Sequence, residues 1–97
     1  MIDSIQDLKQ QAYSVAVRRG KFKALGILDG VQAELDELRE EVETFSAEAR
    51  SHVIPEFCRG EEEAADTLIA LLSTCHHMGW DVIGAALAKH AYNETRQ

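Results

Sequence analysis

Apolar residues recur every three or four positions along most of the 97-residue chain. This spacing gathers them on one face of an α-helix, so it predicts a helix wherever it persists. The predicted helices run over residues 3–18, from 23 or 25 to 50, 61–78 and 82–95. No stretch shows the strict alternation and turn pairs of a β-hairpin. The pattern predicts an all-α, four-helix bundle in a single domain, residues 1–97.

Residues that start or end helices support these boundaries. Serine and aspartate side chains cap helix N-termini, and glycine commonly follows a helix C-terminus. Pro55 cannot continue a helix, so segment 51–60 is predicted to connect the two long helices. The expected boundary residues are Asp3 or Ser4 and Gly20 for the first helix, Gly79 for the third and Asp81 for the fourth.

The apolar stripe of each helix predicts the face that lies in the core. The second helix has the most regular stripe, from Leu28 to Phe45. In the last helix the same spacing places Ile83, Ala86 and Leu87 on the inward face. These stripes are expected to bring all four helices together.

Charge and composition narrow the partners and the location. The chain has 17 acidic residues against 10 lysines and arginines, whereas nucleic-acid binding needs a basic surface. The longest nearly uncharged run, residues 67–79, is shorter than the roughly 20 residues that cross a bilayer, and no secretion signal begins the sequence. We therefore expect no nucleic-acid partner, no membrane partner and a cytoplasmic location. Cys58 and Cys75 are expected to be reduced thiols.

Two pairs of acidic residues lie beside the apolar stripes of the two long helices. Glu34 and Glu37 are three residues apart in the second helix, and Glu63 and Asp66 have the same spacing in the third. Side chains at this spacing share a helix face. If the helices pack antiparallel through their stripes, the four carboxylates meet, and a cation is needed to offset their repulsion. Mg²⁺, or Mn²⁺ in its place, fits because hard divalent cations prefer oxygen ligands.

A second interpretation needs no cation. Acidic helix faces are commonly exposed to solvent, and Arg39 offers ion pairs to the carboxylates around it. On this interpretation the chain is a non-enzymatic helical interaction module. The spacing alone leaves both interpretations open.

The order and spacing of the acidic pairs resemble a known family signature. Glu34-Leu-Asp-Glu37, followed after 25 intervening residues by Glu63-Ala-Ala-Asp66, resembles the ExxE…ExxD signature of the MazG-like all-α nucleoside triphosphate pyrophosphohydrolases. The resemblance extends over about residues 25–96. It includes the last helix, which resembles the closing helix of that family.

Basic residues near both ends of the chain are candidates for contact with substrate. Lys89, Asn93 and Arg96 match a Lys-x-x-x-Asn-x-x-Arg pattern of the family's closing helix, and their spacing places them along one helix face. The resemblance implies that they contact the substrate's phosphates or sugar. Arg18, Arg19 and Lys21, which precede the second helix, are expected to lie in a solvated loop, with contact to phosphate as the alternative.

The resemblance also implies an activity. Members of this family hydrolyse a nucleoside triphosphate between its α- and β-phosphates, releasing a monophosphate and pyrophosphate, and such enzymes clear unwanted nucleotides. The implied ligands of Mg²⁺ are Glu34, Glu37, Glu63 and Asp66, and the implied acceptor of the attacking water's proton is Glu37 or Glu41. The family further implies a homo-oligomer, either a dimer or a dimer of dimers.

Relatives with a narrower substrate remain alternatives. Within the same superfamily, the alternative functions are an all-α dUTP hydrolase and a phosphoribosyl-ATP pyrophosphohydrolase. The sequence does not fix the preferred base, because the residues that contact the base depend on the shape of the pocket.

Overall fold

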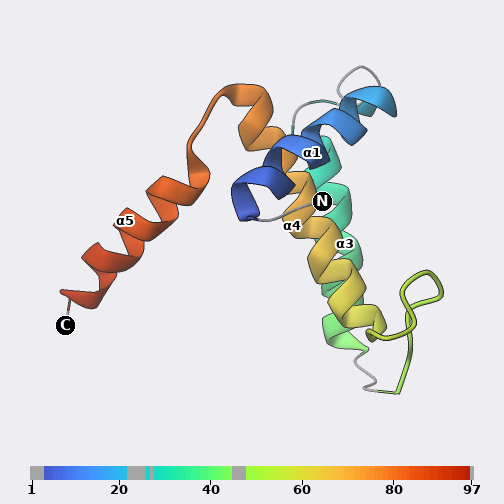
Figure 1. The fold of residues 1–97 in the computed structure, drawn as a ribbon. Coiled ribbons are helices and arrows are strands. Elements are labelled where there is room, and N and C mark those ends of the chain that lie inside the picture. The colour runs from blue at the N-terminus through green and yellow to red at the C-terminus, as the bar shows by residue number, and fades with distance from the viewer. Residues whose placement is uncertain (1–3, 22–25, 27, 45–47, 97) are drawn as a thin grey trace.

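The computed structural model describes residues 4–21, 26, 28–44 and 48–96 (Figure 1). Over these residues the fold is all-helical, as predicted, apart from one isolated antiparallel bridge between Arg50 and Cys58. The helices are α1 (Ile5–Arg18), α3 (Asp29–Glu43), α4 (Arg59–Met78) and α5 (Val82–Glu94).

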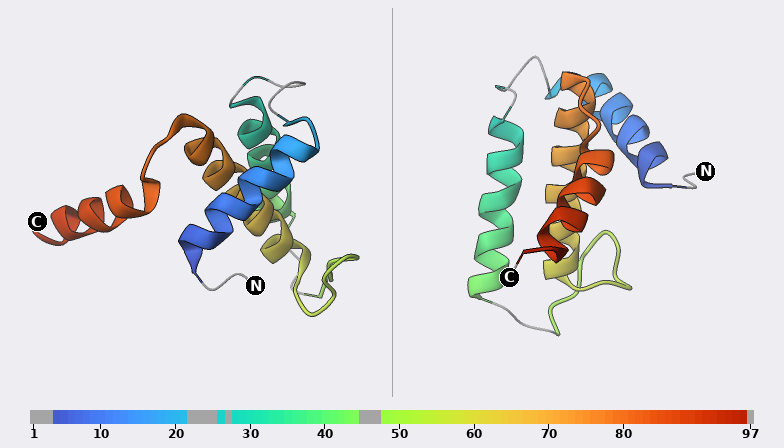
Figure 2. Two further views of the ribbon diagram at one scale, coloured as in Figure 1. Left: turned by 45° about the horizontal axis from the view of Figure 1, so that its top comes forward. Right: turned by 90° about the vertical axis from the view of Figure 1, so that its left-hand side faces the viewer.

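Helix α4 forms the centre of the fold. Helices α1 and α3 both pack against it, and α3 runs antiparallel to it (Figure 2). The buried apolar side chains of the described residues are Ala12 on α1 and Leu72 and Cys75 on α4. Both cysteines are free, as expected.

The predicted capping residues Ser4 and Asp81 accept hydrogen bonds at the helix N-termini in the structure. The Asp7 amide donates to Ser4 Oγ over 3.1 Å, and the Gly84 amide donates to Asp81 Oδ1 over 2.9 Å. Gly79 follows α4 with a φ of 73°, a left-handed conformation that favours glycine because it has no Cβ. The alternative cap, Asp3, lies outside the described residues.

Helix α4 begins at Arg59, two residues before its predicted start. The predicted connection therefore ends at Cys58, whose side chain acts as the N-cap. The Cys58 amide donates to Glu61 Oε1 over 3.0 Å, and the Glu61 amide lies 3.4 Å from Cys58 Sγ. This reciprocal pair satisfies two amides that the first helical turn leaves unpaired.

The predicted long second helix is wrong at both ends. Helix α3 begins at Asp29 and ends at Glu43, while Gly26 and residues 48–50 are not helical. Segment 48–50 is bonded to the start of α4 instead of continuing α3. The Arg59 amide donates to the Ala49 carbonyl over 2.9 Å. The remaining predicted helical positions, 23–25, 27 and 45–47, lie outside the described residues.

Helix α5 does not join the other helices in a closed four-helix bundle. It extends away from α1 and α3 (Figures 1 and 2), and the predicted inward-facing Leu87 is 69% exposed. The radius of gyration is 15.1 Å, whereas a compact domain of this length has about 12.5 Å. The apolar pattern correctly predicts a helix, but in the described structure only the start of α5 is half-buried, and residues 85–94 are exposed.

Candidate functional site

The register between α3 and α4 is set at Thr67. Its Oγ1 lies 2.9 Å from the Glu63 carbonyl oxygen on its own helix and 3.2 Å from the Glu34 carbonyl oxygen on α3. One turn beyond the acidic pairs, Arg59 and Glu41 form an ion pair of 3.2 Å. These two links fix which residues of α3 and α4 face one another. No local sequence signal marks Thr67, because its role depends on the packing of two helices.

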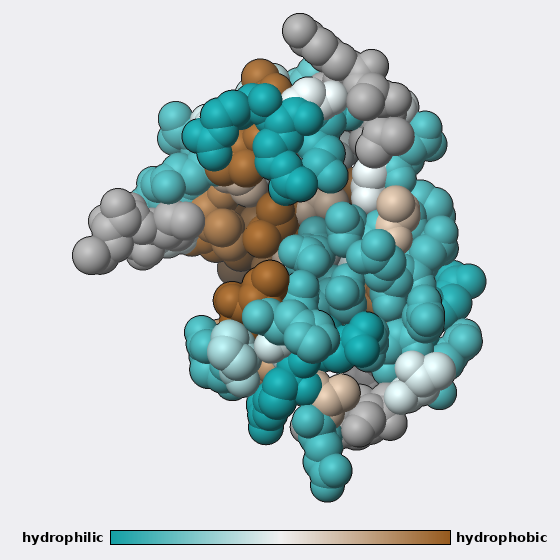
Figure 3. All heavy atoms as spheres, turned by 90° about the vertical axis from the view of Figure 1, so that its right-hand side faces the viewer, coloured by the Kyte–Doolittle hydropathy of each residue, from teal (hydrophilic) through white to brown (hydrophobic). Residues whose placement is uncertain are grey.

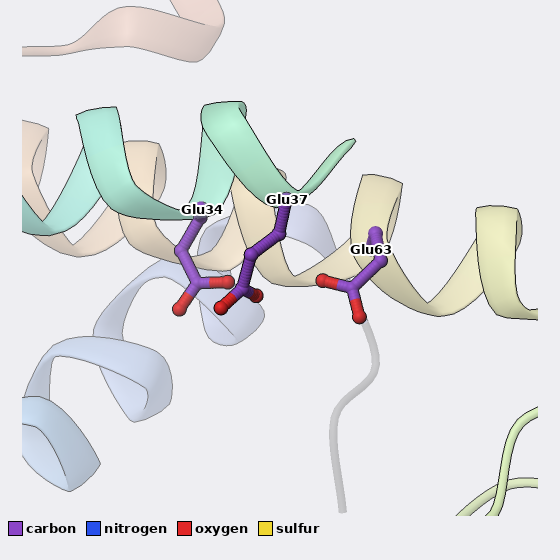
Figure 4. A group of neighbouring side chains, drawn as sticks. All are labelled: Glu34, Glu37 and Glu63. Atoms are coloured by element: carbon purple, nitrogen blue, oxygen red, sulfur yellow. The ribbon is translucent and has the colours of Figure 1, made fainter. Parts of the chain in front are cut away.

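This register brings the predicted carboxylates together. Glu34 and Glu37 on α3 and Glu63 on α4 each offer an oxygen within 4.8 Å of the others. Figure 4 shows that the two α3 side chains point toward the side on which the Glu63 carboxylate lies. A second group, made of Glu62, Glu63 and Asp66, meets the same distance limit on α4. The four predicted ligands therefore lie in two groups that share Glu63, and Glu62 joins them.

Two oxygens of the cluster are buried without a hydrogen-bond donor among the described residues. They are Oε2 of Glu34 and Oε2 of Glu63. A buried acceptor that lacks a donor is destabilising, and it is uncommon in folded proteins. A cation or a proton is needed to compensate these two carboxylates.

The surroundings favour the protonated form of these carboxyl groups. Burial raises the pKa of Glu63 to about 7, and the neighbouring Glu37 carboxyl adds to the increase. Burial also raises the pKa of Glu34 and Asp66, with further contributions from Glu37 at Glu34 and from Glu62 at Asp66. Arg19 and Lys21 oppose part of the increase at Asp66.

A cavity of about 410 Å³ lies between α1, α3 and α4 and reaches this cluster. Glu34 and Asp66 line it, and so do Arg19 and Lys21. Gly20, with a φ of 73°, lies between these two cations and turns the chain after α1. On the face drawn in Figure 3, apolar surface gathers in a hollow bordered by hydrophilic side chains. Arg19 and Lys21 therefore lie beside the carboxylates and do not extend from a remote loop.

Other predicted site residues lie elsewhere in the described structure. Glu41 is paired with Arg59. Lys89, Asn93 and Arg96 lie on α5 or directly after it, away from the acidic cluster (Figure 1). Lys89 Nζ and Arg96 Cζ lie 4.7 and 5.4 Å from the ring centre of Tyr92. Within one chain, these three residues do not reach the carboxylates.

Comparisons with protein-family models, with curated proteins and with solved structures give no match. No helix in the described part of the chain combines the length and apolar character needed to cross a bilayer.

The raised pKa values predict that the metal-free protein loses stability as the pH rises. A carboxyl group whose pKa is higher in the folded state stabilises the fold below its unfolded pKa, and this contribution is lost as the pH passes its folded pKa. For Glu63 the window runs from the ordinary value of 4.5 to about 7. The free energy of unfolding, measured by urea titration in EDTA, is expected to fall across this window. Glu63→Gln should reduce the fall.

Glu40→Gln is the matched control, because Glu40 is an exposed carboxylate on α3 outside both acidic groups. It should keep the pH dependence of the wild type. Identical pH dependence in all three proteins would contradict the assignment of a strained carboxylate cluster.

Proposed function

We propose that this protein is a metal-dependent nucleoside triphosphate pyrophosphohydrolase of the MazG-like type. The observation that carries the proposal is the carboxylate cluster on α3 and α4, which opens into a cavity lined by two cations. Such an arrangement suits a metal–phosphate ligand, because carboxylates hold the metal while basic side chains neutralise phosphate oxygens. The proposed reaction yields a nucleoside monophosphate and pyrophosphate, and its proposed role is to clear unwanted nucleotides in the cytoplasm.

The residues present fit a hard divalent cation such as Mg²⁺ or Mn²⁺. The donor set consists of carboxylate oxygens, the ligand type that these ions prefer. Two of the oxygens are buried and have no donor among the described residues, so a cation would compensate them. Glu34, Glu37, Glu63 and Asp66 are the proposed ligands. When bound, the cation supplies positive charge that offsets the combined charge of carboxylates and phosphates.

Glu37 is the better of the two candidates for the catalytic base. In the proposed hydrolysis, a water adds to phosphorus, the bridging P–O bond breaks, and the water's proton passes to a carboxylate. Glu37 is the exposed member of its group, so solvent reaches it. The Glu41 carboxylate instead pairs with Arg59 at 3.2 Å and belongs to neither acidic group.

Arg19 and Lys21 are proposed to bind the phosphates within the same chain. Both line the cavity beside Asp66 and Glu34. Two fixed positive charges at this position offset phosphate charge that the carboxylates would otherwise repel. This assignment does not depend on α5.

We further propose that the chain works as a homo-oligomer, either a dimer or a dimer of dimers. Helix α5 has 13 residues, and isolated helices of about this length are marginal in water. From residue 85 onward its side chains are exposed in the described structure, Leu87 and Tyr92 among them, and Leu68 and Leu71 of α4 are also exposed. A second copy would cover both surfaces. It would also allow Lys89, Asn93 and Arg96 of one copy to approach the acidic cluster of the other, where their charges are complementary.

The first test of the activity is pyrophosphate release from a panel of ribo- and deoxyribonucleoside triphosphates with Mg²⁺. Wild-type protein is expected to release pyrophosphate, and EDTA is expected to abolish the release. Glu37→Gln and Asp66→Asn should lower kcat/KM at least about 100-fold, because metal-ion charge stabilisation is worth several kcal/mol and each 1.36 kcal/mol is tenfold in rate.

Glu40→Gln again serves as the control and should retain the wild-type rate. The proposal fails if no triphosphate is cleaved and Mg²⁺ leaves the midpoint of thermal unfolding unchanged. In that outcome the acidic helix faces belong to a non-enzymatic interaction module.

Two adjacent arginines test the proposed phosphate contact. Arg19 lines the cavity, whereas its exposed neighbour Arg18 does not. Arg19→Gln is expected to lower kcat/KM about 10- to 100-fold, the effect of losing roughly 1.4–2.7 kcal/mol of charge stabilisation. Arg18→Gln should change it less than threefold. Equal effects of the two substitutions would remove Arg19 from the site.

Sedimentation velocity tests the proposed assembly. The wild type is expected to sediment as a dimer or larger species, and Leu87→Glu should shift it toward the monomer, because a charge then replaces an apolar contact. Val53→Glu is the control, since Val53 is 74% exposed and lies in the connection before α4. A monomeric wild type at micromolar concentration would contradict the assembly.

A further inference from the structure

The cavity has a charged part and an uncharged part. Helix α1 crosses α4 (Figures 1 and 2), with Lys9 Nζ 2.5 Å from the Trp80 carbonyl oxygen and the Tyr13 ring centre 4.7 Å from that of His76. Arg19, which follows α1, lines the cavity together with Asp66 and opposes part of the increase that burial causes in the pKa of that carboxyl group. Most of the other lining residues are apolar or small.

Apolar and small side chains shape the uncharged part. Leu8 of α1 and Ile69 of α4 contribute apolar walls, and Ala12, Ala16 and Ala70 leave room between the helices. The volume of about 410 Å³ lies in the range of pockets that hold small organic molecules, about 300–1,000 Å³. A ligand that fits is an organic group attached to an anion.

Among the described residues that line the uncharged part, few side chains are available to hydrogen-bond a ligand. Ser73 Oγ donates to the Ile69 carbonyl over 2.9 Å, and Thr74 Oγ1 donates to the Ala70 carbonyl over 2.9 Å. Gln11 lines the same cavity, and its side-chain amide makes no hydrogen bond to another described residue. Gln11 is thus the neutral side chain best placed to read the polar edge of a ligand.

We propose that this cavity binds the nucleoside part of the substrate and that Gln11 hydrogen-bonds the edge of the base. This inference rests on the proposed function, because it assumes that the anionic part of the ligand is the triphosphate of the substrate, bound near Glu34 and Asp66. The apolar walls then contact the base and sugar. Gln11 is a specificity residue that touches the substrate and takes no part in the reaction.

The chemistry of the glutamine amide predicts weak selection among bases. The amide offers one acceptor and one donating group, and rotation by 180° exchanges them. Each base presents an adjacent donor and acceptor, so either orientation finds a partner. A carboxylate at this position is acceptor-only, and guanine alone presents two adjacent donors, its ring N–H and its amino group. Gln11→Glu should therefore shift selection toward guanine.

The experiment compares kcat/KM for dGTP with kcat/KM for dATP, dCTP and dTTP. Gln11→Glu is expected to raise the preference for dGTP over dATP at least tenfold relative to the wild type. Gln10→Glu is the matched control, because Gln10 is exposed and does not line the cavity. It adds the same charge and should leave the preference unchanged. A preference that stays within twofold of the wild type in Gln11→Glu overturns the proposal.

Binding of free guanosine and adenosine, measured by saturation-transfer NMR, separates this proposal from the proposed activity. Guanosine should bind Gln11→Glu at least tenfold more tightly than it binds the wild type, and Ala16→Leu, which fills the cavity, should weaken both nucleosides at least tenfold. If this pattern appears while no triphosphate is cleaved, the nucleoside site stands and the proposed activity fails. If triphosphates are cleaved but neither variant changes nucleoside binding, the nucleoside site is wrong and the activity stands.

Discussion

Antiparallel packing of α3 against α4 brings acidic side chains into one partly buried space, and the chemistry of the molecule follows from that constraint. Thr67 bridges the two helices at the level of the acidic residues, and the Arg59–Glu41 pair fixes the register one turn away. The apolar stripes drive the packing, so the carboxylates of Glu34 and Glu63 cannot separate without loss of helix contact. The packing therefore accounts for the raised pKa values of Glu34 and Glu63 and for the two buried oxygens that lack a donor among the described residues.

The same packing links the charged site to the cavity. Helix α1 closes the cavity along α4, and Gly20 turns the chain so that Arg19 and Lys21 lie beside the carboxylates. A ligand with a phosphate chain and an organic group would contact the charged part and the uncharged part of the cavity at the same time. None of the described residues that line the cavity belongs to α5, and the exposed apolar surface of this helix is the main argument for assembly with a second copy.

The sequence predicted the features that depend on interactions between residues close together in the chain. Ser4, Gly79 and Asp81 marked helix ends because capping involves neighbouring residues, and the acidic pairs were found because helical spacing fixes a shared face. The early end of α3 and the position of Arg19 at the cavity were not predicted, since each depends on contacts between segments distant in sequence. The apolar face of α5 was predicted, but a periodic pattern does not say which surface covers it.

Titration with Mn²⁺ tests the central claim, that the carboxylates of α3 and α4 form a divalent-metal site. The readout is paramagnetic loss of backbone amide signals in isotope-labelled protein. We predict that signals of residues 34–37 and 62–67 disappear first, at substoichiometric Mn²⁺. Loss that spreads equally to remote acidic positions such as Asp7 and Glu94, or no loss at all, would contradict the claim.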